Sequence, residues 1–115
     1  MSRRERDRLR DIKEAIVAIW AHIERAGREF AQVDDPLVRA AVLYEFVVIG
    51  EAVKHLSPET RARAPQIRWE DVAGLRDLIA HEYVRIEMKR VLAIVERDLP
   101  TLETAIDGLL ADIGA

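Results

Sequence analysis

The sequence predicts an all-α fold, an up-and-down bundle of four to five helices. Apolar residues recur at steps of three and four along most of the 115 residues, the spacing of one face of a helix. Asp35-Pro36 and Ser57-Pro58 each place an N-cap residue before a proline, a start signal for a helix. No segment alternates as a strand does. With half of its residues hydrophobic and no linker-like stretch, the chain fits a single helical domain over residues 1–115.

The first predicted helix runs from about Arg4 to Ala31. One apolar stripe runs along it, formed by Leu9, Ile12, Ile16, Ile19, Trp20, Ile23 and Phe30. We expect Trp20, together with Trp69 later in the chain, to lie in the core. His22, between two stripe positions, and His55, at a helix end, have no partner at metal-ligand spacing, so both are expected in surface or packing roles.

The second predicted helix begins at Asp35-Pro36 and runs to about Leu56. From Ala40 to Ile49 only Tyr44 and Glu45 are polar, so this helix is apolar nearly all round. A lone bundle would bury one face of it, and a second apolar face implies a further partner. The most economical partner is a second copy of the chain, so the sequence predicts a homodimer.

The remaining helices follow from the same signals. Ser57-Pro58 opens a short helical turn that must end before Pro65, because the residue ahead of a proline avoids helical angles. Apolar residues three and four apart predict a third helix from about Trp69 to Ala80, and Ile86 leads into a fourth. The apolar stripe keeps its phase on both sides of Pro100, which predicts a kinked helix or two stacked helices.

Composition narrows the classes of protein. The chain has no cysteine, so disulfides, thiolate metal sites and cysteine nucleophiles are excluded, and a reducing compartment is compatible. A net charge of −3 argues against coating nucleic acid by bulk electrostatics, so any RNA contact must be local. The basic N-terminus continues into an amphipathic segment without the apolar run of a signal peptide or membrane span. We therefore expect a soluble cytoplasmic protein with no membrane partner.

One cluster looks suited to chemistry: Arg76, His81 and Tyr83 lie within eight residues. On a helix, Arg76 and Tyr83 would be about 20° apart and His81 about 140° from Arg76. Use of all three in one site therefore predicts that the helix unwinds near His81. Asp77 could hold Arg76 or orient a basic side chain of a partner subunit. Glu51 could line a cleft that faces the motif, although an exposed carboxylate is the default.

These residue types suit RNA cleavage without a metal or cofactor. An imidazole ordinarily titrates near neutral pH, so His81 would be the general acid or base. Arg76 would bind the phosphate and stabilise the charge that develops on its oxygens. One histidine supplies one of the two proton transfers, and a dimer would supply both. On spacing alone, the competing interpretation is a helix-terminal histidine beside a half-buried tyrosine, with no site at all.

The motif also resembles that of a known family. Arg76, Asp77, His81 and Tyr83 fit the Arg-x4-His-x-Tyr form of the HepT-like group of the HEPN superfamily position by position. Three further stretches look like the same group: Val48–Ala52, Ile67–Asp71 and Val95–Pro100. Asp77 stands where many relatives have asparagine. Together these stretches are far more specific than the motif alone.

The resemblance implies a helical homodimer whose two motifs form one composite cleft. It implies an RNase toxin of a two-gene toxin-antitoxin module, with an MntA-like minimal nucleotidyltransferase as the antitoxin. That partner would transfer AMP from ATP to the motif tyrosine, here Tyr83, and so place negative charge where RNA must bind. Two alternatives remain open at this stage: a non-catalytic helical binding module that partners a nucleotidyltransferase, and a purely structural helical dimer.

Overall fold

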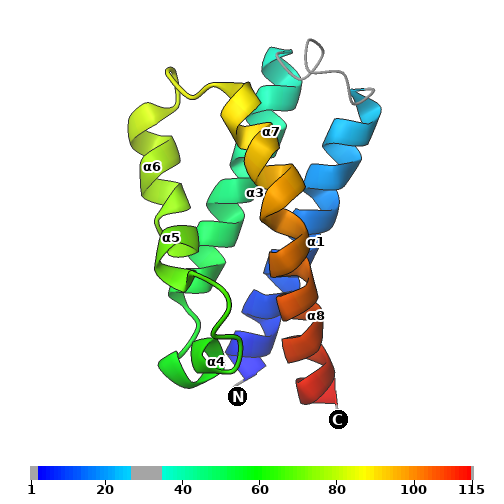
Figure 1. The fold of residues 1–115 in the computed structure, drawn as a ribbon, viewed down its shortest axis with the longest axis vertical. Helices are drawn as coiled ribbons and strands as arrows, with labels where there is room; N and C mark the ends of the chain where they lie inside the picture. The colour runs from blue at the N-terminus through cyan, green and yellow to red at the C-terminus, as the bar shows by residue number, and fades with distance from the viewer. Residues whose placement is uncertain (1–2, 27–34, 115) are drawn as a thin grey trace.

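The computed structural model describes residues 3–26 and 35–114, and these residues form helices and their connections, with no strand (Figure 1). The helices are α1 (Arg3–Arg25), α3 (Pro36–Lys54), α4 (Pro58–Ala62), α5 (Trp69–Ala73), α6 (Leu75–Glu82), α7 (Met88–Arg97) and α8 (Leu99–Gly114). The predicted all-α class is confirmed. The predicted extension of the first helix to Ala31, with Phe30, lies outside the described residues.

The helices stand as four columns that alternate in direction (Figure 1). Helix α1 runs up and α3 down beside it, the short α4 turns the chain at the bottom, α5 and α6 rise, and α7 and α8 descend. Helix α3 packs against α1 on one side and against α5 and α6 on the other, while α8 packs against α1. Helix α3 is thus the central support for the segment that carries the motif.

The core follows the predicted stripe of the first helix. Leu9, Ile12, Ile16 and Ile19 are fully buried. Trp69 is also buried as predicted, and its indole N–H donates to the carbonyls of Arg61 and Ala64, each at 3.0 Å. Trp20, by contrast, is only partly buried and packs on the edge of the core, so its assignment to the interior is correct only in part. Helix α3 contributes its own buried apolar residues, Val42, Leu43, Phe46, Ile49 and Val53.

Both predicted start signals act as caps. The Asp35 carboxylate accepts from the Leu37 N–H at 2.8 Å, and the Ser57 hydroxyl accepts from the Thr60 N–H at 3.2 Å. These side chains satisfy N–H groups that a helix leaves without an intrahelical partner. Helix α3 ends at Lys54 with His55 as its C-cap, close to the predicted end.

Two breaks divide the predicted helices. The third predicted helix, from about Trp69 to Ala80, is not continuous. It divides at Gly74 into α5 and α6, because glycine is a poor helix former. It also runs beyond Ala80, to Glu82. Near Pro100 the chain forms α7 and α8 end to end, with Asp98 between them, which is the second of the two predicted alternatives, two stacked helices. Within the described ranges, no helix combines the length and apolar character needed to cross a membrane.

Candidate functional site

The four motif residues lie on or directly after α6. Arg76, Asp77 and His81 belong to the helix, and Tyr83 caps its C-terminal end. The predicted unwinding near His81 is wrong: α6 is helical through Glu82, and Tyr83 itself keeps helical angles, φ −46° and ψ −48°. Its sequence from Leu75 to Glu82 holds no glycine or proline, and Ile79 buries its inner face in the core. Arg76 and His81 therefore face about 140° apart on one regular helix.

Arg76 lies against α3. Its Nε is 3.3 Å from a carboxylate oxygen of Glu51, and its side chain is about half exposed. Glu51 therefore faces the motif, as the sequence suggested, and its other oxygen is 3.6 Å from Nε2 of His55. The neighbouring Gly50 makes this closeness possible: a Cβ there would lie 3.0 Å from the backbone nitrogen of Arg76. The Gly50-Glu51 pair thus positions both the backbone and the charge of Arg76.

Asp77 pairs with a lysine of its own chain. Its carboxylate lies 3.6 Å from Nζ of Lys54, and its side chain remains largely exposed. Asp77 does not pair with Arg76, so the first of its two predicted roles, holding Arg76, is wrong. The reason is geometric, since adjacent residues on a helix point in different directions. The Asp77–Lys54 and Arg76–Glu51 pairs instead join α6 to α3 at two points.

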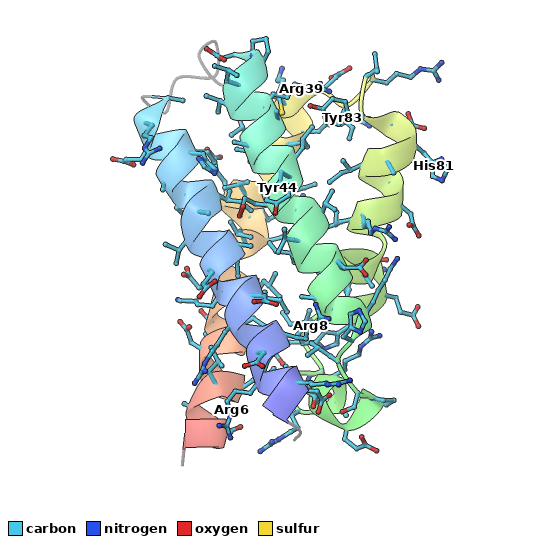
Figure 2. All side chains as sticks on the ribbon, turned by 180° about the vertical axis from the view of Figure 1, so that it is seen from behind. Arg6, Arg8, Arg39, Tyr44, His81 and Tyr83 are labelled. Carbon is cyan, nitrogen blue, oxygen red and sulfur yellow. The ribbon has the colours of Figure 1, made fainter. Side chains whose placement is uncertain are left out.

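His81 projects from the outer side of α6. Figure 2 shows it at the edge of the molecule, pointing away from Tyr83 and from α3, and its side chain is exposed. Within one chain, therefore, the imidazole does not share a cleft with the guanidinium of Arg76. A single chain does not bring the predicted catalytic pair together.

Tyr83 points back toward α3, where it meets a residue that the sequence had not singled out (Figure 2). The guanidinium carbon of Arg39 lies 4.9 Å from the centre of the Tyr83 ring, within the range of a cation–π contact. The same guanidinium donates to the carbonyl of Tyr83 and, at 2.9 Å, to that of Ile86. The one sequence signal was that Arg39 is a lone charge at the start of the apolar run of α3.

No group of three or more histidine, aspartate or glutamate side chains is arranged to hold a metal ion in the part of the chain that the structure describes. His22 is partly buried and His55 caps α3, in keeping with the packing and surface roles expected of them.

The comparison with protein families agrees with the motif and the fold. The model of the family described as "Ribonuclease HepT-like" matches residues 7–109, nearly the whole chain. The chain belongs to the HepT-like ribonuclease family. The resemblance inferred from Arg76, Asp77, His81 and Tyr83 is thereby confirmed at the level of the family.

Two relatives show how far the HepT-like similarity extends. The "Probable ribonuclease HepT" of Thermococcus cleftensis is 31% identical over 112 residues, which cover 95% of this chain and 98% of the relative. The "Putative RNase TTE0752" of Caldanaerobacter subterraneus subsp. tengcongensis is 32% identical over 78 residues, 68% of this chain and 70% of the relative. No solved structure matches the chain. Family and relatives together support ribonuclease activity.

Proposed function

We propose that this HepT-like chain is a metal-independent endoribonuclease toxin that acts as a homodimer. Arg76 and His81 are its catalytic residues, and an MntA-like nucleotidyltransferase neutralises it by AMPylation of Tyr83. The observation that supports the dimer most strongly is the straight α6, on which Arg76 and His81 face apart. A site that needs both groups on one phosphate requires a second motif.

The proposed reaction needs two proton transfers. One His81 takes the proton of the RNA 2′-hydroxyl, whose oxygen then attacks the adjacent phosphorus, and the bond to the 5′-oxygen breaks. His81 of the partner subunit gives a proton to the departing 5′-oxygen. Arg76 stabilises the charge on the non-bridging oxygens. The products are a 2′,3′-cyclic phosphate and a free 5′-hydroxyl, so neither a metal nor a cofactor enters the balance.

Exposed apolar residues indicate which face of the chain would contact the second subunit. Leu37 and Tyr44 on α3 are 80% and 64% exposed, and Val17 on α1 is 51% exposed. In Figure 2, α1, α3 and α6 present one continuous face, with Tyr44 near its centre and His81 at its edge. Exposed apolar side chains in such a group favour a protein interface. A two-fold contact that includes this face and extends along α6 would bury them and bring the two motifs together.

The charge around Arg76 favours a selective enzyme. Its guanidinium is already paired with Glu51, so an RNA phosphate must compete with a carboxylate. A dimer would carry a net charge of about −6, twice the −3 of one chain, which offers little long-range attraction for RNA. We therefore expect cleavage at a few accessible sites in RNA, with local contacts deciding which ones.

The proposed switch acts on Tyr83. Its phenol oxygen would attack the α-phosphorus of ATP, the bond to the β-phosphate would break, pyrophosphate would leave and the phenol proton would pass to solvent. Tyr83 is 40% exposed, so it is open to a modifying enzyme. The added phosphate would bring negative charge and bulk to the end of α6, beside the residues proposed to bind RNA.

The test is an RNA digestion assay combined with intact mass. The chain is purified alone, or after incubation with ATP and an MntA-like nucleotidyltransferase, as wild type, Tyr83→Phe and His81→Ala. We expect the unmodified protein to cleave RNA, His81→Ala to be inactive yet equally helical and dimeric, and AMP to be added to all but Tyr83→Phe. Cleavage retained by His81→Ala would overturn the catalytic assignment. Modification without cleavage by any form would favour the non-catalytic binding module.

A further inference from the structure

Arg39 connects the central helix to the segment that follows the motif. It lies near the start of α3, and its guanidinium reaches the connection between α6 and α7, 44 residues later in the chain at Tyr83 and 47 later at Ile86. It forms three contacts there: one with the face of the Tyr83 ring and one with each of the two carbonyls. These contacts fix both the ring and the backbone of Tyr83.

The three contacts need an arginine. The guanidinium is flat, so it can stack on an aromatic ring while its N–H groups donate in the plane. Tyr83 is the C-cap of α6, where a helix leaves its C=O groups without partners, and Ile86 lies in the connection to α7. A lysine would supply a point charge on a flexible stem, without the flat surface and paired donors. The residue therefore acts through its shape as well as its charge.

The charge of Arg39 is not used by an ion pair. Among the residues 3–26 and 35–114, two carboxylates at the contact of α3 with α6 pair with other groups: Glu51 with Arg76, and Asp77 with Lys54. Arg39 instead uses neutral carbonyls and the ring of Tyr83. A guanidinium in that situation keeps its electrostatic attraction for an anion that arrives at the tyrosine.

We infer that Arg39 is the positioning residue of Tyr83: it sets the orientation in which the phenol meets an incoming phosphate. The inference rests on the proposed function in one respect, that Tyr83 is the acceptor of AMP. In the transfer, the phenol oxygen forms a bond to the α-phosphorus of ATP as pyrophosphate departs. Arg39 holds the ring and the following backbone still, and it provides positive charge on the side where the new phosphodiester forms.

The experiment compares wild type, Arg39→Ala and Arg39→Lys, with Arg63→Ala as the matched control. Arg63 is an arginine at the other end of the bundle, where it pairs with Asp112 at 3.4 Å. The first measurement is amide hydrogen exchange of the peptide covering residues 83–87, which needs no partner or ATP. The N–H groups of Arg85 and Ile86 donate to the Glu82 carbonyl at 2.8 and 2.9 Å, so their exchange reports opening of this connection.

The second measurement is the kinetics of AMP transfer from ATP to the chain by an MntA-like nucleotidyltransferase. We expect exchange at residues 83–87 to become about tenfold faster in Arg39→Ala and Arg39→Lys, with wild-type exchange in Arg63→Ala. We expect kcat for transfer to fall about tenfold in both Arg39 variants while KM for the chain stays within about twofold, because orientation rather than docking is lost.

The outcomes separate the two claims. Unchanged exchange in Arg39→Ala would overturn the inference, because the contacts would then hold nothing in place. Faster exchange with an unchanged kcat would also overturn it, because the orientation of Tyr83 would not matter to transfer. Faster exchange without AMP transfer to any form, wild type included, would overturn the acceptor role of Tyr83 in the proposed function and would leave Arg39 supported as the residue that fixes the Tyr83 backbone.

Discussion

Replacement of Gly50 by alanine tests whether close packing of α3 on the start of α6 positions Arg76. A Cβ at residue 50 would lie 3.0 Å from the Arg76 nitrogen, 3.2 Å from the Val72 oxygen and 3.4 Å from the Ala73 oxygen. All three are backbone atoms, so none can rotate away. The two helices must move apart for the methyl group to fit.

The magnitude follows from two opposing effects. Alanine in place of glycine within a helix stabilises by about 1 kcal/mol. Overpacking against atoms that cannot yield costs about 1–3 kcal/mol. We therefore expect Gly50→Ala to lower the free energy of unfolding by up to about 2 kcal/mol, which for a chain of this length lowers Tm by up to about 8 °C.

The matched control is Gly108→Ala on α8. A Cβ at Gly108 meets no atom within 4 Å, so only the helix propensity should act. We expect this variant to be more stable than wild type by about 0.5–1 kcal/mol. Urea unfolding and RNA cleavage are measured on both, and only Gly50→Ala should lose activity beyond its loss of folded protein. If Gly50→Ala were stabilised as much as Gly108→Ala, the packing argument would be refuted.

Three further predictions concern stability. Hydrogen bonds to Glu103 and Asp107 raise the pKa of Lys13 above its usual 10.5. The stabilisation from these bonds is therefore present below pH 10.5 and is lost as the pH rises through the raised value. Lys13→Ala should lower the free energy of unfolding, measured with urea, by about 1 kcal/mol at pH 7 and by less at pH 11. Burial raises the pKa of Glu45 above 4.5, so ionisation of this carboxyl destabilises the fold as the pH rises past that value. In thermal melts, Glu45→Gln should therefore be more stable than wild type at pH 7 but not at pH 3. Ser57→Ala removes an N-cap and should cost about 1 kcal/mol; no loss in chemical denaturation would contradict the capping role.

Sequence reasoning found what local patterns encode. The caps at Asp35 and Ser57, the buried stripe of α1 and the division near Pro100 all depend on residues within a few positions of one another. The break at Gly74 was missed because a single glycine is often tolerated inside a helix. Trp20 is less deep than expected because it lies at the edge of the stripe, about 100° around the helix from the fully buried Ile19.

The candidate site could be predicted as a set of residue types but not as a geometry. The requirement that Arg76, His81 and Tyr83 meet in one chain led to the wrong expectation of an unwound α6. The contact of Arg39 with Tyr83 joins residues 44 positions apart, and single-sequence spacing carries no information about it. For Glu51, 25 positions before Arg76, the sequence suggested a place facing the motif but not the ion pair. Only the packing of α3 against α6 brings these residues together.

The central claim is that one active site uses His81 from two chains, and subunit mixing tests it most directly. Wild type and His81→Ala are unfolded together, refolded at a series of ratios and assayed for RNA cleavage at constant total protein. If both histidines are required, only pure wild-type dimers cleave, and activity follows the square of the wild-type fraction, about a quarter of the maximum at equal amounts. Activity that falls in direct proportion, to about half at equal amounts, would mean that each chain works alone and would contradict the composite site.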